Sequence, residues 1–167
     1  LPCAHGLPAR GDQAVGTDNL SPYYSVELKK DRLKRVQARF FQRDIADAAA
    51  LERIFESERP EAVLHLAAQA GVRYSLENPA SYVQANLLGF ANLLECCRRH
   101  PPRHLVFASS SSVYGNLAKV PFSEEDPVAE PISPYAATKR SGELLCYTFW
   151  HLYKLPVFCL RFFTVYG

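Results

Sequence analysis

Short runs of apolar residues alternate along this chain with longer segments whose apolar residues recur at helical spacing. The short runs predict strands at residues 13–17, 39–41, 62–66, 104–108 and 157–163. The periodic segments predict helices at residues 25–37, 48–55, 80–99 and 134–153. Strands that are apolar throughout and alternate with helices are typical of a parallel sheet that is buried on both faces and joined by right-handed crossovers. We therefore predict an α/β fold, a doubly wound parallel sheet.

The composition excludes several functional classes. The 167 residues are 48% apolar, which suffices for one core and is too little for two domains. The 19 basic and 17 acidic residues leave a net charge of +2, without the Lys/Arg stripe of a nucleic-acid surface. No apolar run approaches the ~20 residues of a membrane span, and the start lacks the order of a signal peptide, so we expect a soluble cytoplasmic protein. The five cysteines show no Cys-x-x-Cys spacing, which predicts reduced thiols and no metal site.

Polar and small residues gather where the predicted strands end. In open α/β sheets ligands bind beyond the carboxyl ends of the strands. The residues at those ends are Asp18, Asn19, Asp44, Ile45, Ala67–Gln69, Ser109–Ser112 and Thr164. One or two of them could be helix caps, but so many on one edge predict a binding site.

Tyr135 and Lys139 are the candidate catalytic pair. They are four residues apart on a predicted helix, so their side chains share one face. A free tyrosine, with a pKa of about 10, is a poor base at neutral pH, but nearby positive charges stabilise its phenolate. An ordinary amphipathic pair is the alternative, because Tyr-x-x-x-Lys alone is a weak pattern. The hydroxyl-rich strand end that precedes this helix favours the catalytic interpretation.

Four segments give the chain a specific resemblance. They read H-L-A-A at 65–68, S-S-S-S-V-Y-G at 109–115, Y-A-A-T-K at 135–139 and R-F-F-T-V-Y-G at 161–167. The set resembles the extended short-chain dehydrogenase/reductase family of nucleotide-sugar enzymes, the NAD-dependent epimerases and dehydratases. A-A-Q-A-G-V-R-Y-S at 67–75 and L-R-F-F-T-V-Y-G at 160–167 are most similar to its UDP-glucuronate 4-epimerase members. The similarity runs from about Ala9 to Gly167.

The resemblance implies roles for individual residues. Ser110, Tyr135 and Lys139 would be catalytic, and Ser110 would form a hydrogen bond with the reacting oxygen of the sugar. NAD would be held by Asp18, Asn19, Asp44, Ile45, Leu66, Ala67, Ala68, Asn86, Ser109, Tyr135, Lys139 and Phe162. The substrate would contact Arg73, Ser111, Ser112 and Thr164. An acidic residue at position 18 would bind the ribose hydroxyls, which disfavours NADP.

The reaction implied is epimerisation at C4 of a UDP-sugar, UDP-glucuronate to UDP-galacturonate, by oxidation and reduction in one site. Related dehydratases and decarboxylases carry an acidic residue at the position of Ser112, so this serine favours epimerisation. Arg73 could pair with the sugar carboxylate or be a surface residue. Asn86 could serve the cofactor or make a structural bond, and His65 is expected to be a packed strand residue. The resemblance also allows a homodimer.

Two departures from the family pattern change these expectations. The family opens with a strand and a G-x-x-G-x-x-G loop that holds the diphosphate, whereas this chain has Gly6, Gly11 and Gly16. Residues 1–10 are therefore an atypical segment before a partial NAD-binding domain at 11–167. In the strand order 3-2-1-4-5-6 the absent strand is central, so its two neighbours would face a gap or have to pair directly. The family also continues past the position of Gly167 into a substrate lobe.

Three interpretations follow. The first is an incomplete epimerase sequence with weak activity or none, which binds NAD weakly or not at all. The second is a related nucleotide-sugar dehydratase, decarboxylase or UDP-galactose epimerase. The third, of another class, is a non-catalytic remnant or binding module that keeps the fold.

Overall fold

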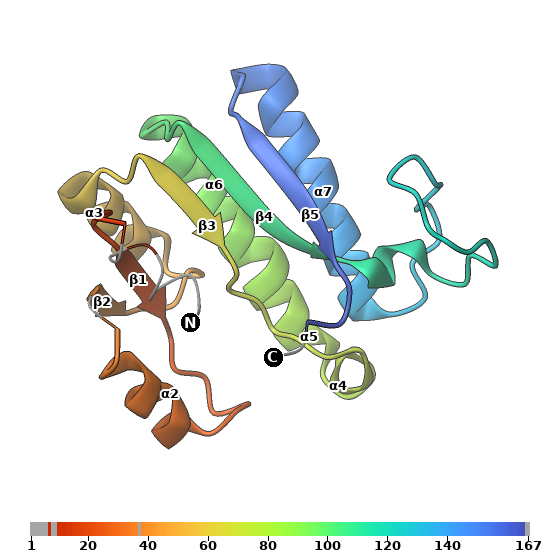
Figure 1. Ribbon diagram of the computed structural model, residues 1–167, viewed down its shortest axis with the longest axis horizontal. Coiled ribbons are helices and arrows are strands. Elements are labelled where there is room, and N and C mark those ends of the chain that lie inside the picture. The colour runs from red at the N-terminus through yellow and green to blue at the C-terminus, as the bar shows by residue number, and fades with distance from the viewer. Residues whose placement is uncertain (1–6, 8–9, 37, 166–167) are drawn as a thin grey trace.

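The computed structural model describes residue 7 and residues 10–36 and 38–165. Within them the chain forms five strands, all paired in parallel, and helices between the strands (Figure 1). The predicted α/β class with parallel strands is confirmed. Cys3 and Gly6 lie outside the described residues, and so does most of the segment 1–10.

The first two strands form a sheet of their own. β1 (Val15–Asp18) pairs with β2 (Arg39–Gln42), and α2 (Val26–Leu33) connects them. Ser25 caps α2 by accepting a hydrogen bond from the amide of Leu28. Neither strand nor α2 has a buried residue, so this sheet contributes little to the core.

The other three strands form a sheet in the order β3–β4–β5. β3 (Ala62–His65) and β5 (Val157–Phe162) flank β4 (His104–Ser110). Figure 1 shows α6 (Gly89–Arg99) and α7 (Pro134–Tyr153) behind this sheet, and α3 (Ala48–Glu58) beside α6. Pro134 stands in the first turn of α7, as predicted, because its fixed φ and missing N–H suit that position.

Of the two arrangements expected for the neighbours of the absent strand, the residues that the structure describes do not show direct pairing. Among the described residues β1 pairs only with β2, and β3 pairs only with β4. Val15 on β1 is 41% exposed and Leu64 on β3 is 43% exposed. The two strand edges therefore lack a common neighbour in this part of the chain, as the family strand order predicts.

The hydrophobic core lies between the three-stranded sheet and its helices. Its buried members are Leu51, Phe55, Phe90, Leu93, Leu94, Cys96, Cys97, Leu105, Phe107, Cys146 and Leu155. Phe90 of α6 stacks on Phe107 of β4 with ring centres 4.5 Å apart. His65 stacks on Phe90 at 4.7 Å and is 5% exposed, so the expectation that it is a packed strand residue is confirmed. Burial and the nearby Lys139 charge lower the pKa of His65 to about 3, which keeps the ring neutral.

The predicted helix at 80–99 is divided into three parts. It comprises α5 (Pro79–Tyr82), the π-helical segment η1 (Val83–Leu88) and α6. A π-turn holds more residues per turn than an α-helix, which shifts the phase of the side chains before it. Val83 is consequently 52% exposed, so its predicted place in the buried stripe is wrong, whereas Phe90, Leu94 and Cys97 are buried. A short helix not predicted from the sequence, α4 (Val72–Glu77), precedes α5.

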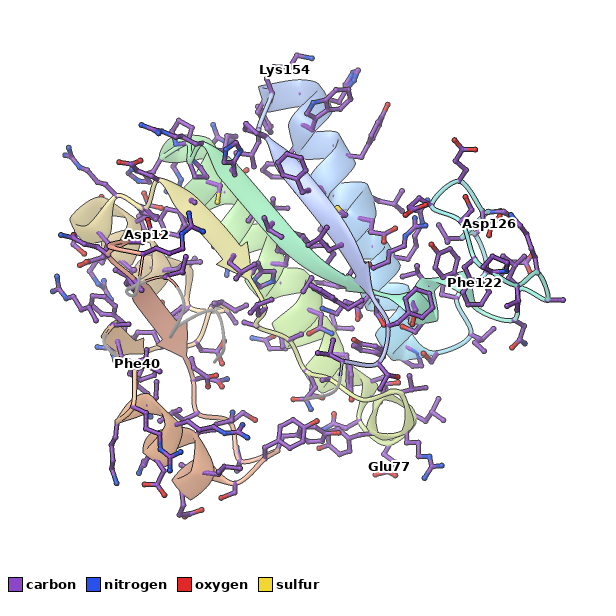
Figure 2. The ribbon with its side chains drawn as sticks, in the orientation of Figure 1. Asp12, Phe40, Glu77, Phe122, Asp126 and Lys154 are labelled. Atoms are coloured by element: carbon purple, nitrogen blue, oxygen red, sulfur yellow. The ribbon has the colours of Figure 1, made fainter. Side chains whose placement is uncertain are left out.

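A long connection follows β4. The 3₁₀ helix η2 (Ser111–Tyr114) leads into the segment 115–133, which projects beside the N-terminal end of α7 (Figure 2). Phe122 of this segment stacks on Tyr114 at 4.6 Å, and Asp126 accepts a hydrogen bond from Lys119. A small second cluster around Val113, Tyr114 and Val128 thus anchors the connection.

Candidate active site

The carboxyl ends of β1 and β2 meet as predicted. The Asn19 side-chain amide donates to Asp44 at 2.9 Å, and the other Asp44 oxygen accepts from the amide of Ala46. Asp18 accepts from the amide of Leu20 at 2.6 Å and pairs with Lys29 at 3.5 Å. Three of the predicted cofactor residues therefore form one polar edge in which side chains fix the turns after both strands.

Ile45 joins this edge to the main core. A Cβ placed on Gly89, in the first turn of α6, would lie 2.6 Å from the Ile45 side chain, so the two segments approach closely because Gly89 has no side chain. Asn92, one turn later, donates to the carbonyls of Ile45 and Ala46 at 3.1 and 3.0 Å. The two sheets are thereby connected through the segment after β2.

Lys139 is buried beside Tyr135 at the start of α7. Its ammonium donates to the carbonyl of Ala108 on β4 at 2.7 Å and lies 5.9 Å from the ring centre of Tyr135. The side chain is 5% exposed, and burial lowers the pKa of Lys139 to about 8. A buried ammonium with one neutral acceptor still has donors to share, which suits it to stabilise a negative phenolate nearby.

Tyr135 is held by aromatic packing. Its ring meets that of Tyr82 edge to face, with ring centres 6.1 Å apart. The Tyr82 hydroxyl donates to the backbone carbonyls of Ala70 and Gly71, in the loop after β3. Tyr135 is therefore oriented by a side chain that is itself fixed to the β3 end of the sheet, while remaining partly exposed.

The serines after β4 differ in their contacts. Ser110 caps η2: its hydroxyl oxygen accepts from the amide of Ser112 at 3.2 Å and from the Ser112 hydroxyl at 2.8 Å. These two bonds use both acceptor positions of the Ser110 oxygen, so the hydroxyl proton of Ser110 is available for donation to another partner. Ser111 and Ser112 are partly exposed in the first turn of η2. Ser109, in contrast, is buried and donates to Glu143 at 2.6 Å.

Glu143 is a residue of the site that the sequence analysis missed. It lies on α7 one turn after Lys139, is 7% exposed, and accepts hydrogen bonds from Ser109, Arg140 and Arg161. Burial alone would raise the pKa of Glu143, but these hydrogen bonds outweigh it and hold the pKa below its ordinary value. The contacts of Ser109 are therefore those of a residue that ties β4 to α7 and β5, and its cofactor role stays a prediction. The spacing of four from Lys139 was the available signal.

Asn86 makes structural hydrogen bonds, which was one of the two roles expected for it. Its side chain accepts from the amide of Gln69 at 2.8 Å and donates to the Gln69 carbonyl and to Thr138 on α7. It thus fixes the loop after β3 against the helix that carries Tyr135. The Gln69 side-chain nitrogen is buried and has no hydrogen-bond acceptor among the described residues. A buried amide without an acceptor marks this loop as a place where a bound molecule would satisfy it.

The remaining predicted residues lie around this assembly with fewer contacts. Arg73 is exposed on α4, and Thr164 is exposed after β5. Leu66 and Phe162, at the ends of β3 and β5, are 49% and 41% exposed. The structure joins Lys139, Tyr135 and the loop after β3 through direct contacts, whereas the substrate roles of Arg73 and Thr164 stay predictions.

Metal-binding clusters and membrane-spanning helices are absent from the part of the chain that the structure describes. Over the described ranges, 7, 10–36 and 38–165, no cluster of three or more His, Cys, Asp or Glu side chains is arranged to hold a metal ion. In that same part of the chain no helix has the length and apolar character that a bilayer crossing requires.

Comparisons with known proteins point to one family. The family model described as GDP-mannose 4,6 dehydratase matches residues 3–167. UDP-glucuronate 4-epimerase 3 of Arabidopsis thaliana is 52% identical over 165 residues, 96% of this chain and 38% of that protein.

Two solved structures share the fold. UDP-glucose 4-epimerase of Thermotoga maritima with UDP-glucose gives a TM-score of 0.87 at 37% identity, covering 97% of this chain and 51% of that one. UDP-glucuronic acid 4-epimerase from Bacillus cereus, in complex with UDP-glucuronic acid and NAD, gives 0.86 at 32% identity, covering 97% and 52%. The chain spans about half the length, or less, of the curated relatives that it matches.

Proposed function

The chain belongs to the NAD-dependent epimerase/dehydratase family, and we propose that its residues form the catalytic half of an epimerase that inverts C4 of UDP-glucuronate. The observation that carries this proposal is the buried Lys139 ammonium beside Tyr135, on a helix tied to the ends of β3 and β4. A surface Tyr/Lys pair would not have its lysine 5% exposed against a strand carbonyl.

The polar edge and the loop after β3 fit a dinucleotide such as NAD. Asp18, Asn19 and Asp44 would bind the adenosine half, since carboxylates accept hydrogen bonds from ribose hydroxyls. The buried Gln69 amide, which lacks an acceptor, would gain one from the bound molecule. Bound NAD would supply the hydride acceptor and donor for C4.

Tyr135 and Lys139 divide the proton chemistry between them. Tyr135 would take the proton of the C4 hydroxyl during oxidation and return it during reduction. Lys139 would stabilise the phenolate, and its buried position strengthens that attraction because solvent does not screen it. The proton therefore stays on groups of the protein between the two half-reactions.

Ser110 would orient the sugar. Its oxygen accepts two hydrogen bonds from Ser112, so its own proton is directed to an external acceptor, here the oxygen on C4. Ser112 stands where related dehydratases carry an acid, and a hydroxyl used in this way leaves no carboxyl to protonate a leaving group. The pair supports epimerisation over elimination.

The choice of glucuronate rests on the relatives and on Arg73. Relatives 50% and 52% identical are named as UDP-glucuronate 4-epimerases, one of them a probable one. An exposed arginine on α4 could pair with the sugar carboxylate in two-point geometry, and Thr164 would contact the same group.

A substrate panel tests this proposal. The protein in its natural full length is incubated with UDP-glucuronate, UDP-galacturonate and UDP-glucose, and the products are separated by chromatography. We expect interconversion of the two acids and little turnover of the neutral sugar. Arg73→Leu should raise KM for the acids, with Arg103→Leu, an exposed arginine before β4, as the control. Turnover of UDP-glucose alone would remove the role of Arg73.

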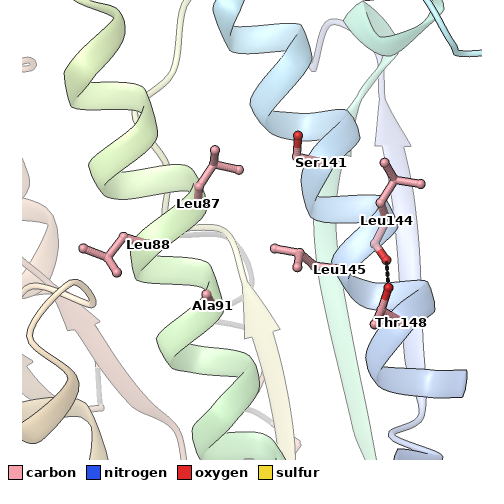
Figure 3. A pocket seen from close by; sticks show the side chains of 7 residues that line it. All are labelled: Leu87, Leu88, Ala91, Ser141, Leu144, Leu145 and Thr148. Atoms are coloured by element: carbon pink, nitrogen blue, oxygen red, sulfur yellow. Dashed lines mark hydrogen bonds between the residues drawn. The ribbon is translucent and has the colours of Figure 1, made fainter. Parts of the chain in front are cut away.

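We further propose that two copies pair through the outer faces of η1, α6 and α7. Apolar side chains line a groove there: Leu87, Leu88, Ala91, Leu144 and Leu145, with Ser141 and Thr148 (Figure 3). Leu144, Tyr147 and Trp150 are 51%, 62% and 48% exposed. An apolar helix pair of this kind matches the self-complementary contact of a twofold dimer.

Sedimentation analysis tests the pairing. Leu144→Glu should shift the protein to monomers because it would bury a charge at the interface. Val120→Glu, at an 83% exposed position in the segment 115–133, is the control and should leave the mass unchanged. A wild-type monomer at high concentration would contradict the pairing.

A further inference from the structure

Cys146 and Cys159 come together where α7 crosses β5. In the sheet Cys159 stands beside Phe107 of β4, whose ring packs against Gly142. Cys146 follows Gly142 by four residues and so lies on the same side of α7, one turn further along. The register and this spacing bring the two thiols next to each other, and each shifts the pKa of the other.

The two thiols have different environments. Cys146 is 2% exposed in the core, whereas Cys159 is exposed on the outer strand of the three-stranded sheet. The adjacent Cys146 thiol lowers the pKa of Cys159, and the nearby Arg161 and Arg140 charges act in the same direction against burial and Glu143. The adjacent Cys159 thiol and burial raise the pKa of Cys146. An accessible thiol with thiolate character next to a second thiol is the arrangement of redox-sensitive pairs.

The adjacent cysteines of α6 provide the contrast. Cys96 and Cys97 are 1% and 0% exposed, and burial raises the pKa of each thiol to about 12. They are neither accessible nor ionised at neutral pH, so they should not react.

We propose that Cys159 is a peroxide-sensitive thiol that Cys146 resolves into a disulfide joining β5 to α7. The Cys159 thiolate attacks one oxygen of a hydroperoxide, the O–O bond breaks, and the leaving oxygen takes a proton as water or an alcohol. Cysteine sulfenic acid results. The Cys146 sulfur then attacks the sulfenic sulfur, its proton and the sulfenic hydroxyl leave as water, and the S–S bond forms. The two thiols are oxidised by two electrons and the peroxide is reduced by two.

The position of this bond gives it a functional consequence. Arg161, two residues after Cys159, donates to Glu143, which in turn accepts from Ser109 beside the proposed catalytic serine. A disulfide at Cys146 would tether the helix that carries Tyr135 and Lys139 to the strand that carries Arg161.

Peptide mapping tests the proposal directly. The full chain is treated with hydrogen peroxide at neutral pH, alkylated, digested with trypsin without reduction, and analysed by mass spectrometry. Cleavage after Arg140, Lys154 and Arg161 separates the two cysteines into peptides 141–154 and 155–161. We expect these peptides to appear linked, lighter by two hydrogen atoms than their sum, and to separate after dithiothreitol.

Three variants control the result. Cys159→Ser and Cys146→Ser should each abolish the link, whereas Cys97→Ser should leave it intact. In Cys146→Ser, Cys159 should carry sulfenic acid that dimedone labels, which reads out the first step even if that variant is less stable. Oxidation of Cys159 to sulfinic acid in the wild type without any link, or a link that involves Cys96 or Cys97, would overturn the proposal.

Discussion

The two sheets of this chain are built differently. The β3–β5 sheet packs its inner face against α3, α6 and α7, and the main core lies between this sheet and these helices. The β1–β2 sheet has no buried residue in its strands or in α2, and Leu20 is the one buried apolar residue that the structure describes between residues 10 and 47. The proposed catalytic residues lie on the first region and the proposed adenosine-binding residues on the second.

This difference indicates which part of the site is rigid by itself. Tyr135 is positioned by aromatic packing and Lys139 by a buried hydrogen bond. Other side-chain positions would leave a buried polar group without a partner, which costs free energy. Asp18, Asn19 and Asp44 depend on exposed turns and on the contacts of Ile45 and Asn92 with α6. Regions with few buried contacts open at lower free energy. We expect the cofactor half to be the less stable one.

The largest effect should come from removing the central ring of the core. Phe107→Ala leaves a cavity where Phe90, His65 and Gly142 converge, and we expect it to lower the free energy of unfolding by about 3–5 kcal/mol. Phe40→Ala, at a half-buried position of β2, is the matched control and should cost well under half of that. Urea unfolding of both variants measures the difference, and equal losses would contradict the contrast between the two regions.

The buried ammonium should make stability depend on pH. Because the pKa of Lys139 is about 8 in the fold and 10.5 otherwise, the folded state releases this proton first as pH rises. The unfolded state then holds more protons between about pH 8 and pH 10.5, so stability should increase across that window, by at most about 3 kcal/mol. Lys139→Met should remove this rise. Unfolding curves at several pH values measure it, and an unchanged slope in the variant would show that another group is responsible.

A pair of glycines offers a sharper comparison. A Cβ on Gly142 would collide with the Phe107 ring, so Gly142→Ala should destabilise by about 1–3 kcal/mol through overpacking. A Cβ on Gly16 in β1 would meet Phe40 at 3.7 Å, an ordinary contact, so Gly16→Ala should change stability little. Thermal melting of the two variants decides between them; a larger loss for Gly16→Ala would reverse our ranking of the regions.

The smallest effect is expected at the connection between the regions. Asn92→Ala removes the bonds to Ile45 and Ala46 and should cost about 1 kcal/mol. Hydrogen exchange should speed up in the amides of β2 while those of β4 stay protected. Asn19→Ala, which loses an exposed bond within the β1–β2 region, is the control. Equal acceleration in β4 would mean that the two sheets open together.

The strands and their parallel direction could be predicted because they depend on local patterns. The strand order predicted only that the neighbours of the absent strand would face a gap or pair directly. The division of the 80–99 helix could not, because a π-turn leaves no periodic signature, and Val83 is exposed as a result. The helix α4 has no buried apolar residue, so its sequence lacks the apolar periodicity from which a helix is predicted.

Within the site, Tyr135 and Lys139 were predicted from their spacing together with the hydroxyl-rich strand end that precedes their helix. The partner of Ser109 did not, because Glu143 and Arg161 converge with it only through packing of α7 on the sheet. The structural bonds of Asn86 could likewise not be read from the sequence, because they depend on its contacts with Gln69 and Thr138.

Replacement of Tyr135 tests the catalytic proposal most directly. The natural full-length protein and its Tyr135→Phe variant are assayed for interconversion of UDP-glucuronate and UDP-galacturonate, and NAD binding is measured by calorimetry. Tyr147→Phe, an exposed tyrosine on the same helix, is the control. We predict that Tyr135→Phe loses at least about 10²-fold in turnover with NAD binding unchanged, because it removes the proton acceptor alone. Turnover equal to that of the wild type would contradict the assignment of Tyr135.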